Sequence, residues 1–159
     1  MATGWSAILW AGFVATTLAA AALRLFRSFG WTEFSPAAQV GCFFVNNPRI
    51  PLAESLGLLV LFLVGTSLLA WLYAAVMRGM GGPSLGSGAL LGVVQGVAVV
   101  ALLPSLGKVS ACVKNGSVPA PGRLGLEWGR GTPAGIVLGH LVYGAALGAT
   151  LAAFAAPPL

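Results

Sequence analysis

His140 is the only histidine of this chain, and it lies within a long apolar stretch near the carboxyl end. A neutral imidazole can bind the iron of a haem or the magnesium of a chlorophyll-type pigment. Gly139 and Gly144 stand beside it and would leave room for a macrocycle. A haem held by two histidines would need the second one from another chain. The alternative interpretation is a neutral histidine that hydrogen-bonds to a helix or to a partner protein.

Gln95 and Tyr143 are two further polar side chains placed deep inside apolar stretches. An unpaired amide in hydrocarbon is costly, so Gln95 needs a hydrogen-bond partner there. The two residues fall at a similar depth when the apolar stretches are aligned by their charged ends, and we expect them to bond to each other. Hydroxyl side chains at the same depth should bond to their own helix backbone; these are Thr16, Thr17, Thr66 and Ser67.

The sequence has no signature of a catalytic site. It contains no Walker-type phosphate loop, HExxH motif or nucleophile elbow. Two cysteines and one histidine cannot complete a four-ligand zinc site, so we expect no metal. The three glutamates lie in or beside loops, too shallow for a proton-coupled transporter, which needs a carboxylate deep in the membrane. We therefore expect no catalytic residue and no enzyme activity.

Four long stretches with almost no charge must position these residues. The chain has 159 residues, of which 58% are hydrophobic and 7% are charged. A bilayer core of about 30 Å needs about 20 apolar residues in a helix that rises about 1.5 Å per residue. The sequence therefore predicts one integral membrane domain over residues 1–159, an all-α, compact bundle of four transmembrane helices at Trp5–Leu23, Ser55–Met77, Gly86–Gly107 and Thr132–Ala156.

Two long loops, 24–54 and 108–131, contain seven of the eight basic residues. The positive-inside rule places these loops in the cytoplasm and both ends of the chain outside. We expect the loops to contact anionic lipid headgroups, and their charge therefore does not indicate nucleic-acid binding. Aromatic residues near the other ends of the first two stretches would form an outer belt; they are Trp5, Trp10, Trp71 and Tyr73.

Each long loop contains one cysteine, Cys42 in the first and Cys112 in the second. In cytoplasmic loops both thiols should stay reduced. If the orientation were inverted, a disulfide between them would join the two loops. The sequence leaves the pairing open, and the absence of a CxxC motif gives no support to a thiol-disulfide enzyme.

Glycines recur at four-residue intervals in the third and fourth stretches. Residues four apart lie on one face of a helix, and helices in lipid associate through close approach of their backbones. We expect these faces to pack within the chain or against a partner protein or a second copy. They consist of Gly88, Gly92 and Gly96, then Gly131, Gly135 and Gly139, and, displaced by one residue, Gly144 and Gly148.

The run Gly139-His140-Leu141-Val142-Tyr143-Gly144-Ala145-Ala146-Leu147-Gly148 resembles the last span of small uncharacterised bacterial four-helix membrane proteins. Several such groups end in a similar His-Leu-Val-Tyr-Gly pattern. The resemblance covers these ten residues. It implies a protein of the bacterial inner, or cytoplasmic, membrane and brings no known activity with it.

Together these features predict a non-catalytic accessory or structural subunit of a larger membrane complex. Its partners would be other membrane subunits that pack against the glycine faces, in a respiratory or photosynthetic assembly by analogy. Two alternatives stay open. One is a subunit that binds a haem or chlorophyll-type pigment through His140, and the other is a homo-oligomeric channel or transporter lined by Gln95, Thr66 and Tyr143.

Overall fold

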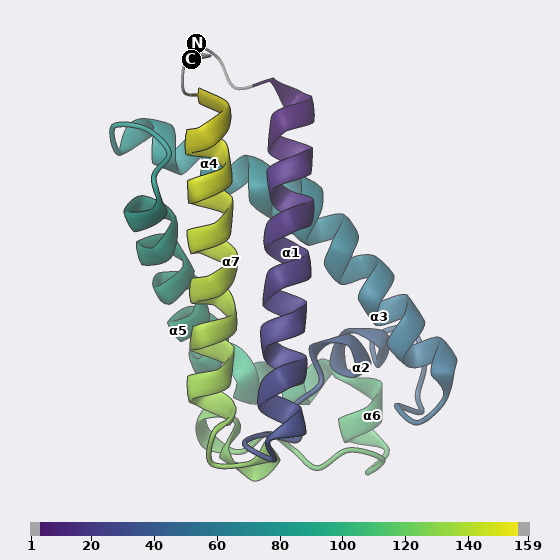
Figure 1. The fold of residues 1–159 in the computed structure, drawn as a ribbon. Helices are drawn as coiled ribbons and strands as arrows, with labels where there is room; N and C mark the ends of the chain where they lie inside the picture. Colours follow the sequence, from purple (N-terminus) through teal and green to yellow (C-terminus); the bar gives the residue numbers. More distant parts are fainter. Residues whose placement is uncertain (1–3, 156–159) are drawn as a thin grey trace. The chain divides into compact units, whose positions relative to one another are not determined.

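A computed structural model describes the chain from residue 4 to residue 155. This described range is helical and contains no strand (Figure 1). The α-helices are α1 (Trp5–Ser28), α2 (Pro36–Gly41), α3 (Pro51–Leu63), α4 (Ala70–Gly79), α5 (Leu85–Val109), α6 (Ala111–Lys114) and α7 (Thr132–Ala155). A π-helix, η1 (Val64–Leu69), joins α3 to α4, and an irregular 3-10 segment, η2 (Arg123–Trp128), precedes α7.

Four helical stretches are long and apolar enough to cross a membrane: Trp5–Ser28, Pro51–Gly79, Leu85–Val109 and Thr132–Ala155. The all-α class and the four-span membrane architecture are thereby confirmed. The helices run past the expected ends because arginine stems can lie along a helix at the interface and because proline suits a first helical turn. Thus α1 continues to Ser28, and α3 begins at Pro51. Ala156, the expected end of the last span, lies outside the described residues.

The chain folds into two compact units, each built from segments distant in sequence. Unit 1 combines residues 4–22, 62–96 and 138–155 of the described range, and unit 2 combines residues 23–61 and 97–137. Arg78 is the only charged side chain of the described part of unit 1. Unit 2 therefore holds ten of the eleven Asp, Glu, Lys and Arg residues of the chain.

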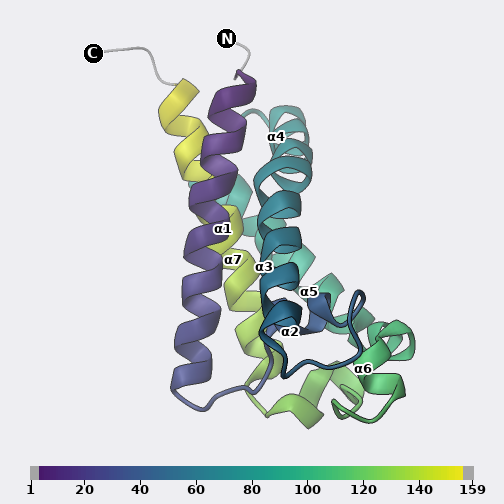
Figure 2. The same cartoon turned by 90° about the vertical axis from the view of Figure 1, so that its right-hand side faces the viewer.

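The core of unit 1 lies between α1, α4 and α7. Ala11 and Ala15 of α1 and Ala70 of α4 are completely buried in it. Small side chains let helices approach closely, which is the main source of association in lipid. Leu147 and Leu151 of α7 pack into the same cluster. Both views of the ribbon accordingly show α7 beside α1 in this unit (Figures 1 and 2).

A short turn joins α4 to α5 within unit 1 and makes them neighbours in a hairpin. Gly81 and Gly82 have φ angles of 98° and 119°, values that glycine adopts without strain. The hydroxyl of Ser84 then accepts the backbone N–H of Ser87 at 3.0 Å and caps the start of α5. This turn places α4 and α5 side by side with opposite directions.

In unit 2 the short helix α2 packs directly on α3. A Cβ atom added to Gly41 would overlap the backbone of Ala53, and one added to Gly57 would overlap the backbone of Ala37. Ser35 starts α2 by accepting the Ala38 N–H at 3.3 Å. The helix α2, which lies between the first two spans in the sequence, therefore packs against the second span.

Trp128, at the end of η2, contacts two other loop segments of unit 2. Its ring stacks on Phe34 with 5.4 Å between centroids, and its indole N–H donates to the Pro119 carbonyl at 2.9 Å. The hydroxyls of Thr32 and Thr132 lie 2.7 Å apart and tie the loop after α1 to the start of α7. Loop segments of unit 2 are thus fixed by specific contacts rather than left without partners.

Candidate functional site

The second span is interrupted in unit 1 by the π-helix η1 (Val64–Leu69). A π-helix replaces the usual i+4 backbone bonds by i+5 bonds, and such segments are frequent at functional sites. This one contains the small or polar run Gly65-Thr66-Ser67. The buried Gly65 lies against the Thr16 side chain of α1, where an added Cβ atom would meet Oγ1 at 2.5 Å. The segment therefore brings backbone polar groups into the core of unit 1.

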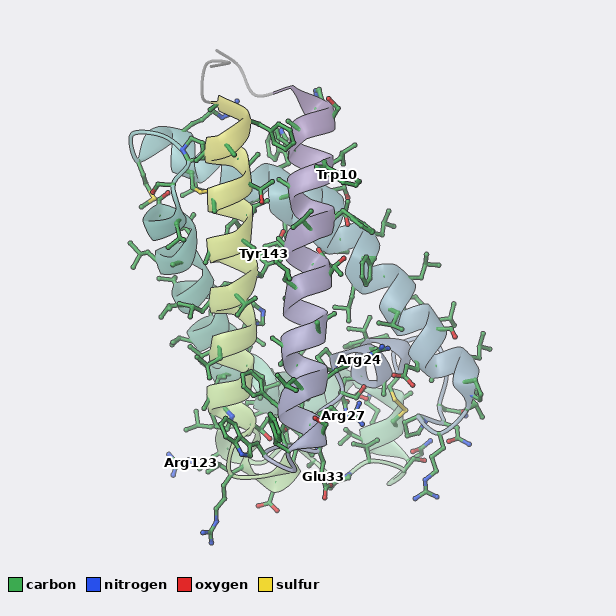
Figure 3. All side chains as sticks on the ribbon, viewed as in Figure 1. Trp10, Arg24, Arg27, Glu33, Arg123 and Tyr143 are labelled. Carbon is green, nitrogen blue, oxygen red and sulfur yellow. A yellow bond between two sulfur atoms is a disulfide. The ribbon has the colours of Figure 1, made fainter. Side chains whose placement is uncertain are left out.

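Tyr143 of α7 uses one of these backbone groups. Its phenolic O–H donates to the Gly65 carbonyl at 2.6 Å. Figure 3 shows Tyr143 on the side of α7 that faces α1, and the side chain is buried, as expected. Its ring also meets that of Tyr73 edge-on, with 5.4 Å between centroids and 87° between planes. Tyr143 thus connects α7 to the second span.

Gln95 has a different partner from the one that depth alone predicted. The phenolic O–H of Tyr73 donates to Gln95 Oε1 at 2.5 Å. The expected Gln95–Tyr143 bond is therefore wrong, because Tyr73 lies across the α4–α5 hairpin from Gln95 while Tyr143 reaches Gly65. Gln95 is half-buried. Tyr73, expected in an outer aromatic belt, is 5% exposed and belongs to the core.

Three of the four hydroxyl side chains that were expected to bond to their own helix do so. Thr16 donates to the Gly12 carbonyl at 2.7 Å, and Thr17 donates to the Phe13 carbonyl at 2.8 Å. Ser67 likewise donates to the carbonyl of Leu63, four residues earlier. For these three residues the expected bond to their own helix is confirmed.

The glycine face of α5 packs on α7 within unit 1. An added Cβ atom on Gly88 would overlap the Gly144 carbonyl, and one on Gly144 would overlap the Gly88 carbonyl. Gly92 faces the His140 carbonyl in the same way, and Gly148 faces that of Ser84. These four glycines were expected to pack either within the chain or against another protein. The structure shows packing within the chain for all four.

Gly131, just before α7, and Gly135, within α7, have other neighbours, all of them in unit 2. Gly131 lies against the Trp31 backbone, and Gly135 lies 3.9 Å from atoms of Phe26 and Thr32. The two displaced sets of glycines therefore have different neighbours: Gly144 and Gly148 meet α5 and the residue before it, whereas Gly131 and Gly135 do not. Gly96 and Gly139, the remaining members of the two expected faces, are buried.

The surroundings of His140 are narrower than the sequence suggested. Its backbone carbonyl packs on Gly92, and Gly144, expected to leave room for a macrocycle, packs on Gly88. The helix α5 therefore fills that side of α7. Across residues 4–155 there is also no group of three or more His, Cys, Asp or Glu residues that could hold a metal ion. A pigment on His140 stays a prediction.

Cys42 and Cys112 form a disulfide in unit 2, with 5.5 Å between their Cα atoms, and Figure 3 shows it as a yellow bond. The expectation of two reduced thiols is wrong for this structure. Both cysteines are completely buried. The Ala111 N–H also donates to the Cys42 carbonyl at 3.3 Å, so the two loops are joined beside the disulfide as well.

Comparisons with protein-family models, with curated proteins and with solved structures find no match to this chain. The four long apolar helices agree with the architecture that the ten-residue resemblance implies. Membership of that bacterial group stays a prediction.

Proposed function

We propose that this chain is a non-catalytic structural subunit of a larger complex in a bacterial inner membrane. The observation that supports this most is how unit 1 uses its deep polar side chains. Tyr73 bonds to Gln95, and Tyr143 bonds to the Gly65 carbonyl, so these groups connect helices. A transport path or a reaction centre in a membrane needs polar groups that face water or a substrate. The alternative of a channel or transporter lined by Gln95, Thr66 and Tyr143 is therefore less well supported, because two of these three side chains are hydrogen-bonded to other helices.

The surface for other subunits would be apolar and outward-facing, because α5 and α7 use four of their glycines on each other. In unit 1, α1 presents an exposed aromatic row. Trp10 stacks on Phe13 with 5.8 Å between centroids, and Phe13 meets Phe62 at 5.9 Å. Aromatic side chains are enriched where proteins meet, since they bury much area at little entropic cost. We propose this row as the contact with a partner subunit of a respiratory or photosynthetic complex.

Gentle detergent extraction from the native membrane, followed by native electrophoresis and identification of co-migrating proteins, tests the proposal. The chain should migrate with a large complex at fixed stoichiometry. Replacing Trp10 and Phe13 together by alanine should release it, whereas Leu18→Ala, also exposed on α1, should not. A particle made only of 16.0 kDa copies would contradict the proposal.

We further propose that unit 2 faces the oxidising side of the membrane. The basic loops alone predict the cytoplasmic side. Disulfides, however, persist in oxidising compartments such as the periplasm and are rare in the cytosol. The buried Cys42–Cys112 bond therefore supports loops outside and chain ends in the cytoplasm. Anionic lipid headgroups at the basic side chains of unit 2 would then be those of the outer leaflet.

A further inference from the structure

A polar pocket of about 490 Å³ opens in unit 2 between the two disulfide-linked loops. Its lining comes from two segments, residues 46–49 and 115–117. None of the lining residues is acidic or apolar, and Arg49 brings a positive charge. The six residues are Asn46, Asn47, Arg49, Asn115, Gly116 and Ser117. Such a lining suits a polar, negatively charged ligand.

The hydrogen bonds of the lining favour a ligand that accepts rather than donates. Asn47 Oδ1 accepts the Arg49 N–H at 3.0 Å, and Asn115 Oδ1 accepts the Ser117 N–H at 2.9 Å. These two amide oxygens are therefore in use, whereas the Asn47 amide N–H groups and the Arg49 guanidinium are donors. Within residues 4–155 Arg49 has no ion-pair partner. An arginine guanidinium binds phosphate oxygens through paired N–H donors, and the amide N–H groups of Asn47 beside it can donate to the same group.

The disulfide holds the two walls of the pocket together. Cys42 precedes Asn46 by four residues, and Cys112 precedes Asn115 by three. Beyond the disulfide, Asn115 Nδ2 donates to the Asn46 carbonyl at 2.6 Å. The two segments are distant in sequence. The disulfide and this hydrogen bond keep them next to each other, so we expect the shape of the pocket to depend on the disulfide.

The pocket also lies next to the ends of two spans. Arg49 stands two residues before α3 begins at Pro51, and α5 ends at Val109, shortly before Asn115. Helix ends of transmembrane segments are where lipid headgroups are found. A phosphate group at that level is available from an anionic phospholipid or from a soluble phosphate compound.

We propose that this pocket binds a phosphate group and that the Cys42–Cys112 disulfide maintains it. This inference is independent of the proposed role as a complex subunit, since it rests on the pocket of unit 2 alone. In this site the Arg49 guanidinium makes the main contact with the negative charge of the phosphate, and the Asn47 amide donates beside it.

The test uses the full chain, purified in a zwitterionic detergent and then placed in phosphatidylcholine nanodiscs. Native mass spectrometry measures retention of phosphatidylglycerol offered to the detergent-purified protein, and calorimetric titration of the nanodisc-embedded protein measures binding of inorganic phosphate. Arg49→Gln should weaken whichever binding occurs by about tenfold or more, because a charge-assisted hydrogen bond is lost. Arg123→Gln removes an equal charge from unit 2 at a residue outside the pocket. This variant should change the same binding affinity less than twofold.

The outcomes separate the two sources of phosphate. Retention of phosphatidylglycerol without binding of inorganic phosphate identifies a lipid headgroup, and the reverse identifies a soluble ligand. No binding in either arm, or equal losses for Arg49→Gln and Arg123→Gln, overturns the site. The double variant Cys42→Ser/Cys112→Ser should lose binding while circular dichroism shows its helices intact. Unchanged binding by that variant overturns the role of the disulfide.

Discussion

The two buried tyrosines of unit 1 use their phenols in different ways. Tyr73 satisfies a side-chain amide, whereas Tyr143 satisfies a backbone carbonyl of the π-helix. Removing the Tyr73 donor leaves the half-buried Gln95 amide without that partner, and an uncompensated polar group costs more than the lost bond itself. In membrane proteins such effects are smaller than in soluble cores, on average below about 1 kcal/mol per bond. Tyr73 and Tyr143 therefore allow the cost of losing a bond to a side-chain amide to be compared with the cost of losing a bond to a backbone carbonyl.

We expect Tyr73→Phe to lower the free energy of unfolding by about 1–2 kcal/mol, since Gln95 then has no donor in hydrocarbon. Adding Gln95→Leu should recover part of this loss, because the uncompensated amide is removed as well. Unfolding by SDS in mixed micelles, followed by circular dichroism, measures both values. The single variant Gln95→Leu completes the comparison. If the double variant lost as much free energy of unfolding as the two single variants together, the Tyr73–Gln95 bond would contribute no coupling.

Sequence reasoning found the buried polar residues but paired them wrongly. Depth along an apolar stretch can be estimated from its charged ends, and this placed Gln95 and Tyr143 near one level. Which side chains meet depends on helix rotation, which depth does not determine. The π-helix changes that rotation in the middle of the second span, where the sequence has the small or polar run Gly65-Thr66-Ser67.

Among the helices of unit 1, α5 and α7 pack backbone against backbone at their glycines. Four-residue spacing was enough to predict that the glycines pack. It was not enough to predict their neighbours, because lipid, a partner or another helix of the chain can all cover a glycine face. The neighbours follow from connectivity: the turn after α4 fixes where α5 lies. Gly131, just before α7, meets Trp31 of the loop after α1, and Gly135 of α7 meets Phe26 at the end of α1 and Thr32 of that loop.

Gly88→Ala should lower the free energy of unfolding by about 1–3 kcal/mol, the usual cost of overpacking, because its Cβ atom would overlap the Gly144 carbonyl. Gly86→Ala is the matched control on the same helix. Its Cβ atom would meet only the Ser84 hydroxyl at 3.9 Å, and alanine favours a helix over glycine by about 0.5–1 kcal/mol. SDS unfolding should thus give opposite signs for the two variants, and equal signs would contradict the close α5–α7 contact.

For the molecule as a whole, the fold class could be predicted and the orientation could not. Bilayer thickness fixes the length of a spanning helix, so four apolar stretches predicted four spans. Pairing of Cys42 with Cys112 bridges 70 positions and depends on how the loops fold, which no local pattern reveals. The basic residues of the same loops favour the opposite side of the membrane from the disulfide. A measurement of orientation therefore decides which of these signals dominates.

We expect a green fluorescent protein fused after Leu159 to fluoresce in a bacterial host and alkaline phosphatase at the same position to be inactive, because the chain end would be cytoplasmic. Phosphatase fused after Gly116 should be active instead. A maleimide reagent added to denatured membranes should label two thiols only after reduction, whereas without reduction it should label none. Active phosphatase at the chain end, together with two thiols labelled before reduction, would show that the basic loops are cytoplasmic. In that case the positive charges, and not the cysteines, would determine how this bundle is inserted.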